Sequence, residues 1–414
     1  MLTLPKLEID RDRLTANIER LAKIGQQPSG SICRLAFTPE TLHARALIQR
    51  WMAELDMHVR IDAAGNLIGT YAGKHPAPSI ATGSHIDTVP SGGKYDGTLG
   101  VLAGLEVVRT LHKNNVRLNH PLEVIVFTDE ESTMIGSQAI AGTVLYDDIE
   151  RYHLSTGQTI QAALESLGGD WDLLATARRD RTTLCAFVEL HVEQGIILER
   201  TGHQIGVVQG VVGMERHKLR ITGQANHAGT TPMDMRQDAL IAASKLVLAV
   251  QTIALALPSQ PVATVGYLTV SPNAVNIVPG TVELNVDMRD LSKEVLDRMI
   301  EQLETEVATI AAETNTEIEM MPLLCVEPTP AAELVQSAIA SVSHQLGLTH
   351  CSLPSRAGHD SLEVGRITDM GMIFVPSQSG LSHSEAEYTS PEQCAQGANV
   401  LLHTLLELDA IYRL

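Results

Sequence analysis

The fold is decided by the stretch Leu122-Glu123-Val124-Ile125-Val126-Phe127-Thr128-Asp129-Glu130-Glu131. Its centre, Val124–Phe127, is short and wholly apolar, which is typical of a central strand covered on both faces. Three acidic side chains follow this strand almost directly. The stretch therefore predicts an α/β domain in which polar side chains stand at the ends of buried strands, where an open α/β sheet binds its ligands.

Helices and strands alternate on both sides of this strand. One amphipathic helix ends before Gly25, and a second begins at Thr38-Pro39, because proline loses no hydrogen bond at the first helical position. Buried strands are expected at residues 185–190 and 372–375, and a capping-box spacing begins the last helix at Ser390. The alternation predicts a layered α/β domain with a mixed sheet and helices on both faces.

The region from 212 to 325 follows a different order of elements. Its predicted helices and strands alternate as β-α-β-β-α-β, the order of the split βαβ unit: Lys218–Thr222, Asp238–Leu257, Val262–Leu268, Val282–Met288, Glu294–Glu313 and Glu317–Leu323. Such a unit can bury a core of its own. We therefore expect a catalytic domain formed by residues 1–211 and 326–414, and an inserted α+β domain formed by residues 212–325.

Composition excludes several classes of partner. The chain has 414 residues, a hydrophobic content of 44% and a formal net charge of −19, so two or three domains with a sizeable core are expected. The acidic charge and the lack of a basic stripe argue against nucleic acid and anionic membranes. Ile241–Leu257 is the most apolar long stretch, but it contains Ser244, Lys245 and Gln251, which indicates a buried helix rather than a membrane span.

The cysteines indicate a reducing compartment. Five of them are scattered along the chain without a Cys-x-x-Cys pair, which is typical of free thiols. Met1–Asp12 contains acids and no apolar core of a signal peptide. We therefore expect a cytoplasmic protein.

Histidines and acids recur at the ends of the predicted strands. His85 and Asp87 follow one strand, Asp129–Glu131 follow the next, His191 ends the strand at 185–190, and His383 follows the strand at 372–375. Each of these has an ordinary explanation when taken alone. A turn pair explains the first two residues, a solvated turn explains the acids, and a lone histidine is more often structural than a ligand.

The group as a whole indicates a metal site. Imidazoles and carboxylates suit zinc, with manganese, cobalt and nickel as alternatives. Two ions that share a carboxylate can hold a water and lower its pKa, and a neighbouring glutamate can accept the proton. Glu130 and Glu131 are adjacent, so one can ligate while the other faces the water. A nucleophilic enzyme is disfavoured, because there is no Gly-x-Ser-x-Gly motif and Cys185 lies in an apolar strand.

The inserted domain carries a second polar set. Asn226–Met233 is expected to form a loop before a helix, and Asn273–Gly280 a hairpin-like connection. Arg289 ends the alternating strand, and its guanidinium fork suits a carboxylate. A surface ion pair with Asp287 or Asp290 is the alternative explanation for this arginine.

Taken together, these motifs resemble the hydantoinase/carbamoylase group of metallopeptidase-like amidohydrolases. This group includes N-carbamoyl-L-amino acid hydrolases, allantoate amidohydrolases and β-ureidopropionases. The resemblance extends from Gln27-Pro28-Ser29-Gly30 to the final helix and is carried by Gly83–Thr88, Val188–Gly195 and Asn226–Met233. It implies two divalent ions per subunit, Zn²⁺ or Mn²⁺ with Co²⁺ or Ni²⁺ possible, and a homodimer formed through the inserted lid domain.

The resemblance also assigns roles to single residues. The implied ligands form two sets that share a bridging Asp96: His85, Asp96 and His191, and Asp96, Glu131 and His383. Asp87 would orient His85, and Glu130 would be the general base. In related peptidases the ligand at the position of His191 is usually acidic, so the histidine favours a carbamoylase.

The substrate residues follow from the same resemblance. Gln194, Asn276 and Arg289 would hold the substrate, with Arg289 on its carboxylate, and His227 would reach the active site of the partner subunit to stabilise the oxyanion. The implied reaction is hydrolysis of a carbamoyl or ureido C–N bond, releasing an amino acid, ammonia and carbon dioxide from an N-carbamoyl-L-amino acid. Alternatives are an allantoate amidohydrolase, a β-ureidopropionase, a dipeptidase or aminopeptidase, and an inactive binding protein. Two departures from the group, Ser132–Ile135 and Arg356, bear on the substrate pocket.

Overall fold

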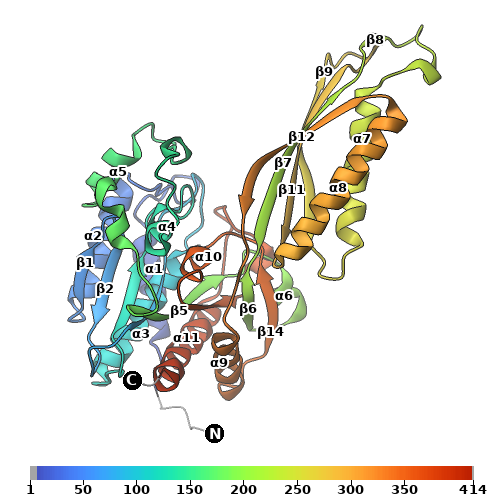
Figure 1. Ribbon diagram of the computed structural model, residues 1–414. Helices are drawn as coiled ribbons and strands as arrows, with labels where there is room; N and C mark the ends of the chain where they lie inside the picture. Colours follow the sequence, from blue (N-terminus) through green and yellow to red (C-terminus); the bar gives the residue numbers. More distant parts are fainter. Residues whose placement is uncertain (1–6, 413–414) are drawn as a thin grey trace. The chain divides into compact units, whose positions relative to one another are not determined.

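The computed structural model describes residues 7–412, so the first half of Met1–Asp12, the stretch considered above as a signal peptide, lies outside the described residues. The chain forms two compact units, one of Met1–Gly210 with Pro330–Leu414 and one of Val211–Thr329 (Figure 1). We call them unit 1 and unit 2. Within residues 7–412, no helix is both long and apolar enough to cross a membrane.

Unit 1 is built on a mixed nine-stranded sheet of order β1-β2-β4-β3-β5-β15-β6-β13, with β14 paired to β6. The central strands β4, β3, β5 and β15 are parallel, β2 pairs antiparallel with β1 and β4, and β6 pairs antiparallel with β15. The strands are β1 (His58–Ile61), β2 (Leu67–Tyr71), β3 (Ser79–Ser84), β4 (Leu122–Val126), β5 (Leu184–Val192), β6 (Ile205–Val211), β13 (Thr329–Pro330), β14 (His350–Ser355) and β15 (Asp369–Val375). The expected layered α/β fold with a mixed sheet is confirmed.

The helices of unit 1 begin and end at local signals in the sequence. Thr38 accepts a hydrogen bond from the Thr41 amide at the start of α2, and Ser390 and Gln393 form a capping box at the start of α11. The helices are α1 (Arg11–Ala22), α2 (Pro39–Ala53), α3 (Thr98–Lys113), α4 (Ile135–Ala141), α5 (Ile160–Ser166), α6 (Ile197–Thr201), α9 (Glu333–Gln345), α10 (Asp360–Val364) and α11 (Pro391–Ile411), with 3₁₀ turns η1 (Ile149–Arg151), η2 (Trp171–Ala177) and η4 (Gln378–Gly380).

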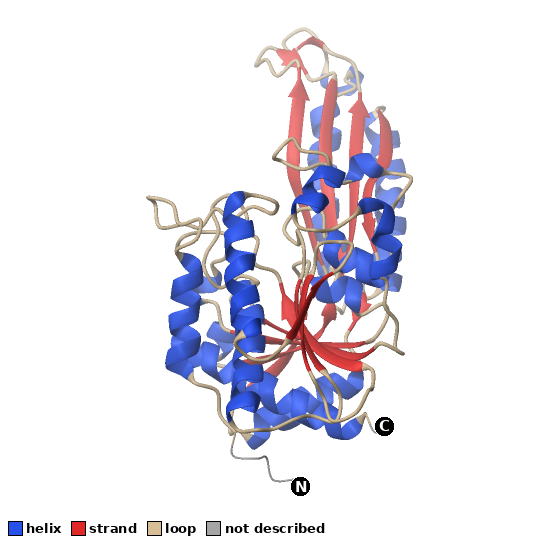
Figure 2. Ribbon diagram, turned by 90° about the vertical axis from the view of Figure 1, so that its left-hand side faces the viewer, coloured by secondary structure: helices blue, strands red, loops and turns tan. Residues whose placement is uncertain are grey.

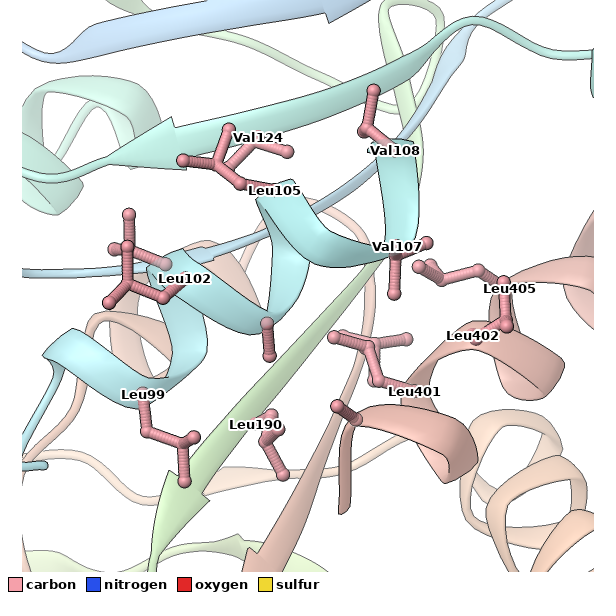
Figure 3. Packing of buried hydrophobic residues seen from close by; sticks show 14 of the residues in the cluster. Leu99, Leu102, Leu105, Val107, Val108, Val124, Leu190, Leu401, Leu402 and Leu405 are labelled. Carbon is pink, nitrogen blue, oxygen red and sulfur yellow. The ribbon is translucent and has the colours of Figure 1, made fainter. Parts of the chain in front are cut away.

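The main core of unit 1 lies between the sheet and the helices α3 and α11. Figure 3 shows Leu190 of β5 beneath α3, with Leu401 of α11 beside it. Successive side chains of a strand point to opposite faces, so Glu189 and His191 face away from this core. The strand continues one residue beyond His191, because its pairing with β15 extends to Val192. The predicted strand at 185–190 was therefore too short at both ends.

Unit 2 has a four-stranded antiparallel sheet of order β12-β7-β11-β9 with two long helices along one face (Figure 2). Val282, Leu284, Val286 and Met288 alternate with partly exposed residues along β11 and pack in a core with both helices. The elements are β7 (Gly213–Thr222), β8 (Asn226–His227), η3 (Met233–Met235), α7 (Ala239–Leu255), β9 (Val262–Ser271), β10 (Ile277–Val278), β11 (Thr281–Asp290), α8 (Lys293–Thr314) and β12 (Glu317–Val326).

Candidate metal centre

The parallel strands β3, β4 and β5 deliver their polar residues to one edge of the sheet of unit 1. His85 follows the last residue of β3, the acids Asp129–Glu131 come after β4, and His191 is the penultimate residue of β5. Because carboxyl ends of neighbouring parallel strands meet at the same edge, these side chains lie close together. The loop after β15 adds His383 to the group.

Asp96 is the centre of the group, and its two carboxylate oxygens face different partners. Oδ1 lies 3.1 Å from Nε2 of His191 and 3.5 Å from Nε2 of His85. Oδ2 lies 3.3 Å from Nε2 of His383. Burial raises the pKa of Asp96, but the hydrogen bonds with these three histidines outweigh it and hold the pKa well below its usual range. Asp96 is therefore a carboxylate that joins two sets of imidazoles.

The rings of His85 and His191 are fixed by their own backbone surroundings. Nδ1 of His85 lies 3.0 Å from the main-chain oxygen of Asp87, and Nδ1 of His191 lies 2.8 Å from the oxygen of Val192. Each Nδ1–H can donate to its carbonyl, so Nε2 is the nitrogen that faces Asp96 and would exchange its proton for a bound metal ion.

Asp87 contributes to this arrangement mainly through its backbone. Its carboxylate oxygen Oδ1 lies 3.8 Å from Nδ1 of His85, farther than the main-chain oxygen. The other carboxylate oxygen, Oδ2, accepts a hydrogen bond from the Glu131 amide at 3.2 Å. Asp87 therefore links the loop after β3 to the acids after β4.

The three consecutive acids after β4 point in different directions. The carboxylate of Glu130 lies 3.6 Å from Nε2 of His85, and that of Glu131 lies 3.6 Å from Nε2 of His383. Asp129 has a left-handed backbone, with φ of 58°, and its carboxylate accepts hydrogen bonds from the amide and hydroxyl of Thr133. Two of the acids therefore face the imidazoles, and the third holds the following turn.

The acids are buried at a cost that a cation would offset. The side chain of Glu130 is 8% exposed and that of Glu131 is 12% exposed. Burial raises the pKa of Glu130 well above its usual range, against the opposing effect of His85, and raises the pKa of Glu131 to about 7. Buried carboxylates beside imidazole nitrogens are the environment in which a bound divalent ion is stabilised. The donor set therefore fits a metal.

Among residues 7–412, three groups of donors have ligand atoms within 4.8 Å of one another. Two of these groups share Asp96: His85, Asp96 and His191, and Asp96, Glu131 and His383. A third group contains Glu189, His191 and His359. Its glutamate already accepts hydrogen bonds from the hydroxyls of Ser84 at 2.7 Å and Ser361 at 2.6 Å, so this third group is less suited to an ion.

Two further residues position the centre and were not found from the sequence. Oε1 of Glu387 accepts hydrogen bonds from the amides of Tyr95 at 2.9 Å and Asp96 at 3.1 Å. Arg34 is fully buried and donates to the carbonyl of Ile86 at 2.6 Å and to the hydroxyl of Thr98 at 3.1 Å. Glu387 lies four residues after His383, a weak signal, and nothing local in the sequence points to Arg34.

Gln194 contacts the same carboxylate as the histidines. Its side-chain nitrogen donates to Oδ2 of Asp96 at 2.8 Å, and its backbone has a positive φ of 56°. Its expected role toward the substrate stays a prediction. The hydroxyl of Ser382 also lies 3.1 Å from Oδ2 of Asp96, so this oxygen is enclosed by polar groups.

The remaining expected residues lie in unit 2, at two separate places. His227 pairs with Ile277 in the short β8–β10 ribbon, and the Ala228 amide donates to the Asn276 carbonyl at 2.9 Å, so His227 and Asn276 lie close together. Arg289 is near the other end of β11, where Nε donates to Asp287 at 2.8 Å. The ion pair foreseen as an alternative for this arginine is therefore present.

Imidazoles and carboxylates gathered at the carboxyl ends of parallel strands form a donor set that fits divalent metal ions, as is typical of metal-dependent hydrolases built on an α/β sheet. The family model described as peptidase family M20/M25/M40 matches residues 81–407. An N-carbamoyl-L-amino acid amidohydrolase of Geobacillus stearothermophilus is 42% identical over 412 residues, covering 97% of this chain and 99% of that protein. An allantoate amidohydrolase of Bacillus subtilis is 33% identical over 404 residues, covering 96% of this chain and 98% of that protein.

A solved structure agrees with these sequences. An amidase of the hydantoinase/carbamoylase family from Burkholderia multivorans has 37% identity and a TM-score of 0.91, covering 97% of this chain and 98% of that chain. The chain therefore belongs to peptidase family M20/M25/M40 and, within it, to the hydantoinase/carbamoylase group of hydrolases. The resemblance expected from the sequence is confirmed.

Proposed function

We propose that the protein uses two divalent metal ions to hydrolyse the carbamoyl C–N bond of an N-carbamoyl-L-amino acid. The observation that carries the proposal is the placement of Asp96, whose oxygens face His85 and His191 on one side and His383 on the other. The name of the relative at 42% identity supports the substrate class. The products would be the amino acid, ammonia and carbon dioxide.

The five candidate ligands would hold the ions in two sets that share Asp96, namely His85, Asp96 and His191, and Asp96, Glu131 and His383. Bound divalent ions supply a Lewis acid and lower the pKa of a bound water. Asp87 would keep the sets in place through its contact with the His85 ring and the hydrogen bond it accepts from the Glu131 amide, and Glu387 through the hydrogen bond it accepts from the Asp96 amide.

Glu130 is the proposed general base. It is buried, faces His85 rather than the solvent, and is adjacent in sequence to the ligand Glu131. Its carboxylate would accept a proton as water adds to the carbamoyl carbon, and would deliver that proton to the leaving nitrogen. The C–N bond then breaks, ammonia departs, and the carbamate that remains loses carbon dioxide to give the amino acid.

The arrangement of unit 2 supports a homodimer. His227 lies beyond one end of β11, and Arg289 lies near the opposite end of that strand. The eight residue-to-residue steps from Thr281 to Arg289 span roughly 26 Å at about 3.3 Å per step. A small N-carbamoyl amino acid cannot touch both side chains of one chain. If Arg289 binds the substrate carboxylate and His227 stabilises the oxyanion, the two residues serve different sites, and two subunits are required.

We also infer a reducing, cytoplasmic environment. All five cysteines are free, and burial raises the pKa of the Cys185 thiol to about 11, which makes it unreactive.

A second candidate function is hydrolysis of allantoate, because the allantoate amidohydrolase of Bacillus subtilis is similar over nearly the whole chain.

The proposal is tested by ammonia release from the full chain reconstituted with Zn²⁺, Mn²⁺, Co²⁺ or Ni²⁺. The substrates are N-carbamoyl-L-amino acids, allantoate, β-ureidopropionate and a dipeptide panel. Release from N-carbamoyl-L-amino acids that is lost with a chelator is the expected result. Exclusive turnover of allantoate would favour the second candidate, and cleavage of dipeptides alone would contradict both.

A further inference from the structure

Glu131 faces a cavity as well as His383. The cavity has a volume of about 220 Å³ and lies wholly within unit 1. Apolar side chains from three separate segments form much of its wall: Leu35, Phe37, Val89, Pro90 and Leu154. Pockets that enclose a complete small ligand are larger, about 300 to 1,000 Å³. The space therefore suits a substituent of a ligand whose reacting part lies elsewhere.

The charges around the cavity exclude an anionic occupant. Asp87, Asp129 and Glu131 line it, and none of the described residues that line it is a lysine or an arginine. The carboxylates already have partners, because Asp87 accepts from the Glu131 amide and Asp129 accepts from Thr133. A carboxylate in this space would be repelled, while an apolar group would contact the hydrocarbon wall.

The wall of the cavity contains buried side chains and strained backbone. Phe37 and Leu154 belong to a buried cluster that includes Ile135 of α4. Phe37 and Asp129 both have left-handed φ values, 64° and 58°, which are unusual for residues other than glycine. Such strain is found where the surrounding structure needs a side chain in a particular place, often at a binding site.

We propose that this cavity receives the uncharged, mainly apolar side chain of the N-carbamoyl-L-amino acid. The inference rests on the proposed function and specifies its substrate class. Ser132 also lines the cavity, at the start of the segment that the resemblance drawn from the sequence marked as a departure. The substrate side chain would contact Ser132 and the apolar wall, which makes the cavity a determinant of specificity.

The test compares two phenylalanine substitutions in one loop. Thr156 lines the cavity and is exposed, so Thr156→Phe fills the space without disturbing the core. Gln158 is exposed two residues later and does not line the cavity, so Gln158→Phe is the matched control. The metal-loaded enzyme is assayed with N-carbamoyl derivatives of glycine, L-leucine, L-glutamate and L-lysine.

The readout is the ratio of kcat/KM for the leucine derivative to that for the glycine derivative, because this ratio does not depend on the fraction of folded or metal-loaded enzyme. We expect wild type to prefer leucine over the other three derivatives. Thr156→Phe should lower the ratio by about 10-fold or more, since a hydrophobic pocket discriminates single methylene groups by about that factor. Gln158→Phe should change it by less than about 2-fold.

Each other result overturns a specific claim. An unchanged leucine-to-glycine ratio in Thr156→Phe would show that the cavity does not bind the substrate side chain, and so would a fall of the same size in both variants. Turnover of the glycine derivative in these variants would leave the proposed function standing. A wild-type preference for the glutamate or lysine derivative would contradict an apolar occupant. If none of the four derivatives is hydrolysed, the proposed function fails and the cavity assignment falls with it.

Discussion

At the scale of single residues, the site depends on side chains that divide their contacts. Asp96 uses Oδ1 toward His85 and His191 and Oδ2 toward His383. Glu130 and Glu131 are neighbours in sequence but face different histidines. A short segment of chain can therefore supply both a ligand and a base, provided that its backbone is held firmly.

Glu130→Gln should abolish most turnover while both ions stay bound. The amide keeps the size of the side chain but cannot accept the proton of the attacking water, so kcat should fall by at least about 100-fold. The measurement is steady-state ammonia release together with metal content by elemental analysis. Wild-type kcat in a metal-loaded Glu130→Gln enzyme would exclude the role as base.

Gly97→Ala should remove activity because the residue has no room for a side chain. A Cβ at Gly97, where φ is +61°, would lie 2.4 Å from Nε2 of His85. The clash displaces either His85 or the adjacent Asp96, so we expect loss of metal and of ammonia release.

Gly202→Ala is the matched control for backbone strain. Gly202 also has a positive φ, +72°, but a Cβ there meets nothing within 4 Å. It should cost about 1 kcal/mol of stability and leave activity intact. Equal metal content and activity in the two variants, each compared at the same folded fraction, would refute the crowding around His85.

At the scale of elements, alternate side chains of β5 face either the hydrophobic core or the candidate metal centre. Leu190 packs beneath α3 and α11, and the adjacent His191 faces the opposite side with its ring 4.5 Å from that of His359. Helix α11 covers the core face of the sheet, and it begins at the end of the loop that carries His383 and Glu387. The start of this helix therefore contributes to the position of the loop.

Ser390→Ala should destabilise unit 1 by about 1 kcal/mol, because it removes the hydroxyl that accepts from the Gln393 amide. Gln393→Ala removes the reciprocal hydrogen bond to the Ser390 amide. The two residues form one capping box, so the double variant should lose less than the sum of the single variants in urea unfolding. Fully additive losses would show that the two hydrogen bonds are independent.

At the scale of the whole molecule, the separation of His227 from Arg289 decides what a complete site requires. Arg289 belongs to β11 of the four-stranded sheet of unit 2, whereas His227 belongs to the separate β8–β10 ribbon beyond the other end of β11. Flexibility of one side chain cannot close a gap of roughly 26 Å. The proposed chemistry therefore needs an assembly.

A mixture of His227→Ala and Glu130→Gln chains should recover activity that neither has alone. In a mixed dimer, the chain with an intact Glu130 receives His227 from the partner subunit. Random mixing of equal amounts gives about a quarter of the wild-type sites in working order. The measurement is ammonia release after dissociation and reassembly. No recovery, with mixed dimers present by native mass spectrometry, would show that His227 acts within its own chain.

Much of the fold and the candidate ligands could be predicted from local patterns. The apolar run Val124–Phe127 indicated a central strand, and the acids after it indicated a strand-end site. His85, Asp96, Glu131, His191 and His383 were expected through the resemblance, and the structure gathers them into two groups. Their roles as ligands stay predictions until metal is measured.

The positioning residues could not be predicted in this way. Glu387 bonds the amide of Asp96 across 291 positions of the chain, and Arg34 bonds the carbonyl of Ile86 across 52. The carbonyl rather than the carboxylate of Asp87 lies nearer to His85, a detail of backbone path that no motif records. The cavity beside Glu131 likewise combines segments that are distant in sequence.

The sequence by itself determined the α/β class, the split order of unit 2 and the kind of chemistry, because hydrophobic period, turn residues and donor types are local properties. Only the tertiary structure decided which oxygen of Asp96 faces which histidine, that Asp129 turns away from its neighbours, and that an apolar cavity adjoins Glu131. These features depend on which strands pair and which loops meet. Long-range packing and hydrogen bonds set those contacts, and residue type alone does not encode them.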